Sequence, residues 1–340
     1  MSDQADKQET VTPASGRMET IKFLLKVTLT LTILAGCFTL VDFDALANAL
    51  SRADPRYLGA TFIITVIGSI VVPAFLTWNS LIQDRVSLSL GQLIMINFSL
   101  RFYMLVLPRP VSIGMRWFRY RQGGHGMDAL ALMVFERLVQ LLVYSCTAVV
   151  LLGSSLDSLP AFGQYIWLAS MLVFLLAVTA IMPFFSVAAS RLLGRFIAIS
   201  EKFIPAFLVR SILKLLGAVG AFQTLKLANV LVVIGCSLTS FVLLIAGSWV
   251  LMQTMDFSIS LLDLAWIRSV IFIITQIPIT VGGIGLREAS FISLLHLYGV
   301  AEHDALAYSL MFLGIHIAIG LIGMANEGIQ YFLRRTSEAY

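Results

Sequence analysis

Six stretches of this sequence are long and apolar enough to cross a lipid bilayer as helices. A spanning helix needs about 20 mostly apolar residues to traverse about 30 Å of hydrocarbon. Of the 340 residues, 59% are hydrophobic and 12% are charged, whereas a soluble domain is about half apolar and about a quarter charged. The sequence therefore predicts an all-α polytopic membrane helical bundle and excludes a soluble enzyme. The predicted spans are 21–41, 58–79, 128–152, 164–185, 229–252 and 305–333.

Basic residues are distributed unevenly among the connections between these spans. The connections at 153–163 and 253–263 contain Asp157, Asp256 and Asp263 and no Lys or Arg. The other side holds Arg17, Lys22, Lys26, Arg191, Arg195, Lys202, Arg210, Lys214, Lys226, Arg334 and Arg335. The positive-inside rule then places both termini in the cytoplasm. The same topology explains the net charge of +4 without a nucleic-acid partner.

The sequence outside the spans divides into a tail and two surface segments. Residues 1–16 are polar and carry no signal-peptide pattern, which predicts a disordered cytoplasmic tail before a single transmembrane domain at 17–335. Segment 42–57 is expected as a short helix on the outer interface. Segment 186–226 mixes basic and apolar residues and is interpreted as a cytoplasmic amphipathic helix on anionic lipid, rather than a substrate site.

Two further apolar segments, 91–121 and 264–298, are interrupted and too short in each half to cross the bilayer. We expect each to form a re-entrant helical hairpin, the first entering from the cytoplasm and the second from outside. Broken backbone is tolerated at membrane depth only where it is buried or lines a cavity. The residues predicted to form the turns are Pro108, Pro110 and Gly114 in the first hairpin and Pro278, Gly282, Gly283 and Gly285 in the second.

The two broken segments share one pattern: a proline, a short turn, then Ile-Gly, an apolar residue and Arg, at 107–116 and at 277–287. With opposite entry sides they form an inverted repeat, which in transporters indicates the binding site. The helix after each turn would direct its N-terminal N–H groups into the cavity, where a phosphate or carboxylate is favoured.

Charged residues at membrane depth agree with such a site, because they are costly there and usually face an interior or water. Arg268 is one candidate for that depth. We expect Arg287 to pair crosswise with Glu136, since sequence neighbours on a helix do not face each other. The alternative is that the pairs only hold helices together. The predicted substrate-binding residues are Arg116, Arg287, Glu288, Glu136, Arg137 and Arg101.

Other polar residues favour structural interpretations. His316 lies inside a span and is expected to be a satisfied core histidine, with proton coupling as the less favoured alternative. Asn97, Asn229 and Asn326 are interhelical contacts or ligands. Neither a metal nor another cofactor is expected, because Cys37, Cys146, Cys236, His125, His296 and His303 show no ligand spacing.

The run 277–289, followed by 298–300 and 305–307, closely resembles the signature of the lysylphosphatidylglycerol synthase transmembrane region, a flippase-like family. Pro108, Gly114 and Arg116, then 129–131 and 136–138, match its other recurrent pattern. The resemblance covers roughly residues 20–330. The sequence departs from the family at Met115, where an acidic residue is common, and around Gly314 and His316, where the last span often has an arginine.

The resemblance implies an inner-membrane protein with two re-entrant hairpins that moves an anionic or modified lipid head group between leaflets. In bifunctional relatives a soluble aminoacyl-transferase domain follows; this sequence ends at Tyr340, so lysyl transfer is not expected. The expected substrate is a phospholipid, a polyprenyl-phosphate-linked sugar or a lipid of the hopanoid class.

Two alternatives stay open at this stage. One is an accessory subunit of a glycolipid or cell-envelope biosynthesis complex, in which segment 186–226 docks a glycosyltransferase. The other is a membrane-embedded lipid-modifying enzyme with Glu288 or Glu136 as general base. The sequence offers no catalytic constellation for an enzyme: it has no metal-ligand cluster, no Ser/His/Asp set and no acidic pair for a metal-bound nucleotide sugar. Lipid movement is therefore the favoured hypothesis.

Overall fold

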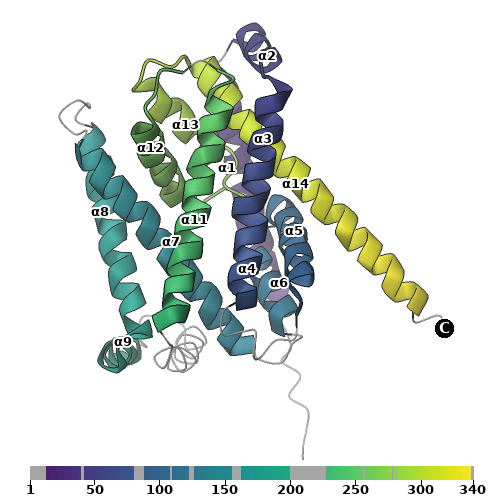
Figure 1. The fold of residues 1–340 in the computed structure, drawn as a ribbon, viewed down its shortest axis with the longest axis vertical. Coiled ribbons are helices and arrows are strands. Elements are labelled where there is room, and N and C mark those ends of the chain that lie inside the picture. The colour runs from purple at the N-terminus through teal and green to yellow at the C-terminus, as the bar shows by residue number, and fades with distance from the viewer. Residues whose placement is uncertain are drawn as a thin grey trace, which may run out of the picture.

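All regular secondary structure in the described residues is helical, as predicted for this chain (Figure 1). The computed structural model describes residues 13–39, 42–79, 88–107, 109–121, 126–154, 162–199, 227–255, 257–277, 279–280 and 282–337. The helices up to the middle of the chain are α1 (Pro13–Thr39), α2 (Phe43–Ser51), α3 (Pro55–Val66), α4 (Val72–Asn79), α5 (Leu90–Val106), α6 (Arg109–Arg121) and α7 (Gly126–Ser154). They are followed by α8 (Phe162–Ile181), α9 (Val187–Ile199), α11 (Leu227–Met252), α12 (Leu261–Ile274), α13 (Leu286–His296) and α14 (Glu302–Ser337).

Five helical stretches of the described chain are long and apolar enough to span a membrane, and they confirm five of the predicted spans. They are Pro55–Asn79, Leu130–Ser154, Gly163–Phe184, Val230–Met252 and Glu302–Gln330. Helix α1 covers residues 21–39 of the remaining predicted span, 21–41; residues 40 and 41 lie outside the described chain. Helix α2 turns away from α1 by 90°, and the two together make a sixth candidate span. A short helix was expected at α2; its place at a membrane interface stays a prediction.

Polar residues mark where several helices begin. Asp42 accepts hydrogen bonds from the N–H groups of Asp44 and Ala45 at the start of α2. Ser89 and Gln92 form a reciprocal capping box at the start of α5. Such side chains satisfy N–H groups that have no partner inside the helix, so they stop the apolar segments at defined residues.

Helix α1 begins at Pro13, so the last residues of the predicted tail are helical, while residues 1–12 lie outside the described part of the chain. Extending an existing helix by one turn is far easier than nucleating a new one. Helix α9 covers the start of the predicted amphipathic segment, and Arg191 and Arg195 are exposed on it. Residues 200–226, with the remaining basic residues of that segment, lie outside the description.

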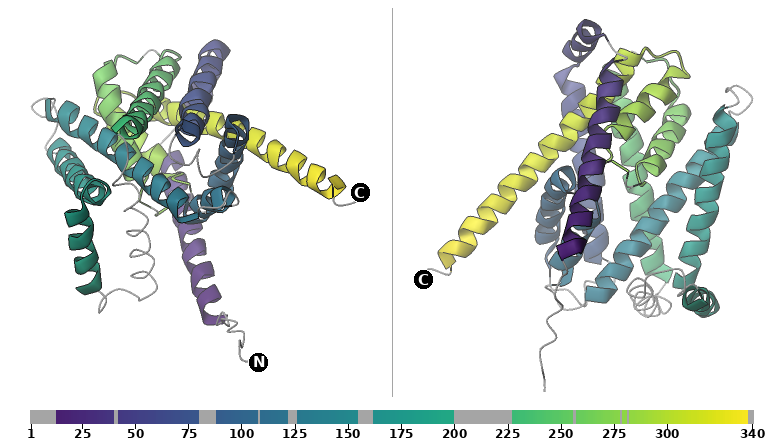
Figure 2. Two further views of the ribbon diagram at one scale, coloured as in Figure 1. Left: turned by 60° about the horizontal axis from the view of Figure 1, so that its bottom comes forward. Right: turned by 180° about the vertical axis from the view of Figure 1, so that it is seen from behind.

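The two interrupted segments lie at opposite ends of the bundle. Helices α5 and α6 occupy the lower half in Figure 1, and α12 and α13 the upper half. Both described chain ends lie at the lower end, together with α9 (Figures 1 and 2). That the two segments form an inverted repeat, and that either of them is re-entrant in a bilayer, stay predictions.

Two large apolar clusters and a small third one, formed by Ile70, Ile315 and Ile319, make up the interior of the described chain. The first joins α12, α13 and the first part of α14, with Trp266, Phe291 and Tyr308 fully buried. The second joins α4, α5, α6 and the first half of α7, with Tyr120 and Phe135 fully buried. Each large cluster therefore packs around one of the interrupted segments.

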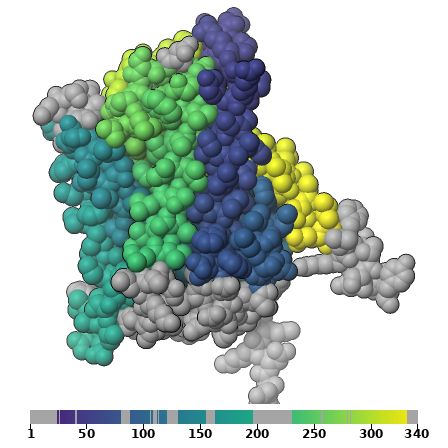
Figure 3. All heavy atoms as spheres, in the orientation of Figure 1, coloured from purple at the N-terminus to yellow at the C-terminus, as the bar shows by residue number. Residues whose placement is uncertain are grey.

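Lipid-facing apolar surface covers the outside of the bundle. Leu168, Leu172, Leu175 and Leu176 on α8 are all more than half exposed. In water these leucines would be an aggregation hazard, but in lipid they are the expected surface of a spanning helix. Figure 3 shows α8, α11 and α3 presented side by side on one such face.

Candidate functional site: a basic cluster between the two broken segments

Arg116 and Glu136 form an ion pair between the first broken segment and the next span. Arg116 lies on α6, and its Nη2 is 3.2 Å from Glu136 Oε2 on α7. Its Nε donates to the hydroxyl of the buried Tyr120, also at 3.2 Å. Glu136 is buried as well. Because loss of either partner would leave a buried charge unpaired, this pair stabilises the contact between α6 and α7.

Arg287 and Glu288 pair with each other at the start of α13. Arg287 Nη2 lies 2.5 Å from Glu288 Oε1. Glu288 is fully buried, accepts from the Gly285 N–H at 2.6 Å through Oε2, and accepts from Ser309 Oγ at 3.3 Å. The carboxylate thus caps α13, neutralises Arg287 and contacts α14 at the same time.

The expected crosswise pair between Arg287 and Glu136 was wrong. The rule that adjacent residues face apart holds inside a helix. Glu288 stands in the first turn, where its side chain folds back onto the turn before the helix, and the long Arg287 side chain reaches it there. Glu136 pairs instead with Arg116 of the first broken segment.

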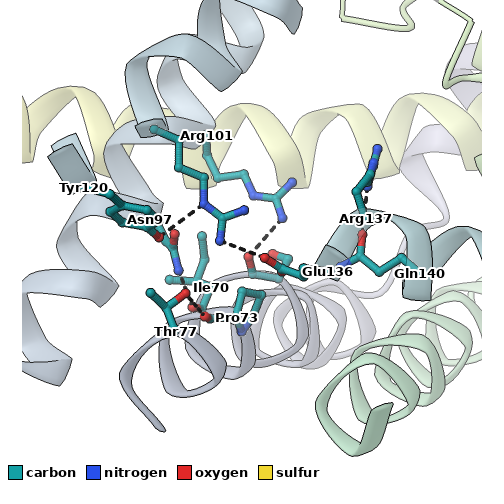
Figure 4. Close-up of polar contacts among 11 residues, drawn as sticks. Ile70, Pro73, Thr77, Asn97, Arg101, Tyr120, Glu136, Arg137 and Gln140 are labelled. Atoms are coloured by element: carbon teal, nitrogen blue, oxygen red, sulfur yellow. Dashed lines mark hydrogen bonds and ion pairs between the residues drawn. The ribbon is translucent and has the colours of Figure 1, made fainter. Parts of the chain in front are cut away.

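Arg101 caps a distortion in the helix that precedes it in the chain. Residues Ile67–Val71 form a single π-helical turn, η1, between α3 and α4. Such a turn leaves backbone carbonyl groups without their usual α-helical hydrogen-bond partners. Arg101 Nη2 donates to Ser69 O at 3.0 Å, and Asn97 Nδ2 donates to Ile70 O at 3.0 Å. Both side chains come from α5 (Figure 4), so Asn97 is a structural contact rather than a free ligand.

Arg137 lies on the more exposed side of α7. Its Nη1 donates to Gln140 Oε1 at 2.8 Å, and its Nη2 donates to Gln276 Oε1 in the turn after α12. The guanidinium also lies over the Phe272 ring, 4.9 Å from its centroid. Arg137 therefore connects α7 to the second broken segment.

Arg268, which the sequence places at membrane depth, is buried in the structure. It lies on α12, is only 7% exposed, and its Nε has no hydrogen-bond partner in the described part of the structure. The signal was present in the sequence: a single arginine stands in the apolar run Leu264–Ile274. Charge at such a position is normally functional.

Aromatic and backbone contacts connect the helices that carry these arginines. Arg137 lies over the ring of Phe272 on α12, and that ring stacks on Tyr144 of α7 with centroids 3.7 Å apart. Arg268, one helical turn before Phe272, lies over Phe291 on α13 and Phe312 on α14. A Cβ on Gly320 of α14 would stand 3.7 Å from the Arg101 carbonyl oxygen. The tertiary structure therefore brings α5, α7, α12 and α13 together beside α14.

His316 is hydrogen-bonded within its own helix. Its Nδ1 lies 2.7 Å from the carbonyl oxygen of Phe312. Since a carbonyl only accepts, Nδ1 carries the proton, which fits the satisfied-histidine interpretation. Asn326 is likewise an interhelical contact, donating to Ser99 Oγ at 2.9 Å.

The predicted turn residues divide into two groups. Gly282, Gly283 and Gly285 all have positive φ, at 64°, 81° and 84°, a conformation that other residues adopt only with strain. Gly114 instead lies inside α6, because that helix already begins at Arg109. Proline is readily accommodated in a first helical turn, so Pro110 does not delay the helix start. Pro108 and Pro278 lie outside the described residues.

One ion pair was not anticipated at all. Arg119 Nη2 on α6 contacts both carboxylate oxygens of Glu327 on α14, at 2.7 and 2.8 Å. The partners are too far apart in the sequence for any local pattern to reveal them. Among the described residues, no group of three or more His, Cys, Asp or Glu could hold a metal ion.

Comparison with known proteins identifies a family. The family model described as the lysylphosphatidylglycerol synthase TM region matches residues 23–323. No curated protein matches the chain. The matched range includes both broken segments and every arginine of the cluster.

Proposed function

Because the chain belongs to the family of the lysylphosphatidylglycerol synthase TM region, a membrane domain of lipid-related proteins, we propose that it moves a lipid with an anionic or glycosylated head group between the leaflets of the cell inner membrane. Both termini are then cytoplasmic, and the lower end in Figure 1, with the exposed arginines of α9, faces the cytoplasm.

The excess of positive charge in the interior carries this proposal. Among the described residues, the partly or fully buried Arg101, Arg116, Arg268 and Arg287 have two buried carboxylates between them, those of Glu136 and Glu288. The exposed Arg137 lies at the edge of this group. Burying arginines without equal negative charge is unfavourable, so the arrangement supports an anionic ligand that completes the balance. Arginine also binds phosphate oxygens in pairs, which suits a phosphate-bearing head group.

The two broken segments supply the route. Each hairpin enters from one side and ends near the arginines, so a head group passes between the hairpins while its tails stay in lipid. The pair Arg116–Glu136 ties the first hairpin to α7 at one end, and the pair Arg287–Glu288 lies on the second hairpin at the other. Opening one pair at a time gives alternating access to the two leaflets.

Leaflet movement of fluorescent lipids in proteoliposomes tests the proposal. The probes are phospholipid and polyprenyl-phosphate analogues, and the variants are Arg287→Ala and Glu288→Gln at matched folding. The control is Arg195→Gln on α9, because Arg195 is exposed and distant from the cluster. We expect the wild type and the control to move lipid and both cluster variants to lose at least 90% of the rate, on the order of the loss of one charged contact.

A folded wild type that moves none of these lipids would overturn autonomous lipid movement. Activity that appears only beside a glycosyltransferase or another cell-envelope biosynthesis protein would then favour the accessory-subunit alternative. Chemical conversion of the lipid by the purified chain would favour the membrane-embedded enzyme, with Glu136→Gln and Glu288→Gln identifying the base.

A further inference from the structure

Arg268 is a buried cation without a counter-ion in the described structure. Arg116 and Arg287 each form an ion pair with a buried carboxylate, whereas Arg268 has neither an ion pair nor a hydrogen bond among the described residues. A second cation, Arg287, stands one helical turn before Phe291 on α13, on the same face as the ring that Arg268 contacts. A guanidinium at membrane depth would normally be paired with a carboxylate or with backbone carbonyls.

Aromatic rings hold this guanidinium in place. Its Cζ lies 5.2 Å from the centroid of Phe291 on α13 and 4.6 Å from that of Phe312 on α14. The two rings are parallel, with an interplanar angle of 6°. Cation–π contacts orient the planar group but use none of its N–H donors. Arg268 is therefore positioned by α12, α13 and α14 and still has unused donor capacity.

Two polar groups in the surrounding helices, the Tyr308 hydroxyl and the Glu288 carboxylate, form hydrogen bonds with residues other than Arg268. Tyr308, whose ring packs edge-to-face against Phe291 and Phe312, donates its hydroxyl to Ser248 O at 2.7 Å. Glu288 is occupied by Gly285, Arg287 and Ser309. Neither group supplies the acceptor that Arg268 lacks.

We propose that Arg268 binds the phosphate group of an anionic lipid directly, with Arg287 beside it, and that this contact distinguishes anionic from zwitterionic lipids. The proposal deepens the proposed function and rests on it for the identity of the ligand as a lipid. A phosphate oxygen supplies the acceptor for Nε and the negative charge that offsets both guanidinium groups. In this structure α13 and α14 close over the site, so head-group entry separates them from α12.

Ligand-dependent thermal stability of the purified full chain in a neutral detergent tests this without a transport assay. The probes are phosphatidic acid, phosphatidylcholine and inorganic phosphate. The variants are Arg268→Met, which keeps an unbranched apolar stem and removes the charge, and Arg268→Gln as a second neutral form. Arg195→Gln is the control for general loss of positive charge.

We expect phosphatidic acid to stabilise the wild type and the control, and phosphatidylcholine to do so much less. Both Arg268 variants should require about 10- to 100-fold more phosphatidic acid, the factor for one lost charge-assisted hydrogen bond. Without lipid, at least one of these variants should melt at or above the melting temperature of the wild type. The reason is that the substitution removes the free-energy cost of burying an unpaired charge in the folded state. An effect of inorganic phosphate that also depends on Arg268 would show that the phosphate group alone is recognised.

Two outcomes would overturn the inference. Both variants could retain the full response to phosphatidic acid, or both could melt well below the wild type without lipid, which is the signature of a purely structural cation–π contact. Failure of the proposed function looks different: lipid binding would depend on Arg268 while no lipid crosses the bilayer in proteoliposomes. Transport and binding that both survive Arg268→Met would instead remove this inference and leave the proposed function standing.

Discussion

Gly282 lies directly against the backbone of Met104, so the turn of the second broken segment touches the end of α5 in the first. A Cβ on Gly282 would stand 3.3 Å from the Met104 carbonyl oxygen, and its φ is +64°. The two segments are separated by more than 150 residues of sequence. Their meeting point joins the halves of the molecule close to the arginine cluster.

Substituting Gly282 with alanine should therefore destabilise the protein for two reasons. A left-handed conformation costs an alanine about 1 to 2 kcal/mol, and the Met104 carbonyl would also have to move. Gly299→Ala is the matched control, because Gly299 has a φ of +74° but open space around its Cβ position. We expect a larger loss of thermal stability for Gly282→Ala than for Gly299→Ala. Equal losses would show that the contact with Met104 has no energetic weight.

Removing one partner of the Arg116–Glu136 pair should cost more than removing both. Glu136→Gln leaves Arg116 buried and uncompensated, which costs about 3 to 5 kcal/mol for a buried pair. The double variant Arg116→Gln/Glu136→Gln should recover a large part of that loss in detergent unfolding experiments. Combining Glu136→Gln with Arg287→Gln is the control and should give no such recovery, because Arg287 pairs with Glu288.

Helices α5 and α14 approach each other closely enough to require glycine. A Cβ on Gly323 would lie 2.0 Å from the Phe98 carbonyl oxygen, and one on Gly320 would lie 2.3 Å from Leu105 Cδ1. Small residues allow such contacts between membrane helices. Gly323→Ala should lower the free energy of unfolding by about 1 to 3 kcal/mol, the usual effect of overpacking.

Gly328 on the same helix is the control, since a Cβ there would meet nothing within 4 Å. Gly328→Ala should leave stability unchanged or raise it by up to about 1 kcal/mol, because alanine favours the helix. A Gly323→Ala variant as stable as Gly328→Ala would contradict the close packing of α5 on α14.

Stability should fall at high pH because of Tyr298, which follows α13. Burial raises the pKa of Tyr298, and so does its hydrogen bond to the Asp263 carboxylate, where the hydroxyl donates to Oδ1 at 2.7 Å. The neutral tyrosine is thus favoured in the folded state. Its contribution is complete below the unfolded pKa of about 10 and is lost as the pH rises through the higher folded value.

Tyr298→Phe is the variant that isolates this effect. Its stability should decline less steeply than that of the wild type above pH 10, after allowance for other tyrosines and lysines. Tyr165→Phe is a suitable comparison, because Tyr165 is largely exposed. Identical pH profiles for the wild type and Tyr298→Phe would remove Tyr298 as the cause.

The helical bundle and five of its spans could be predicted from the sequence alone. Apolar runs of spanning length have one stable form in lipid, because every backbone polar group must be bonded within the segment. The same reasoning located both interruptions. It also identified the glycines of the second turn, since a run with three glycines among four residues has few other uses at membrane depth.

The pairing of charges could not be determined in this way. Whether Glu136 meets Arg116 or Arg287 depends on how α6, α7 and α13 pack, and sequence spacing carries no information on that packing. Local rules failed for Arg287 and Glu288 because the end of a helix, unlike its interior, lets neighbouring side chains turn toward each other. The prediction that Gly114 lies in the turn of the first broken segment was also wrong, because α6 begins several residues before it.

The sequence by itself determined a chain that must lie in lipid, broken at two places and carrying arginines where arginines are costly. Only the tertiary structure decided which of those arginines are neutralised and which are not. The physical reason is that an opposite charge stabilises an arginine strongly only when the two groups lie within a few ångströms of each other. Arg116 and Arg287 have carboxylates within that range, whereas Arg268 has aromatic rings instead.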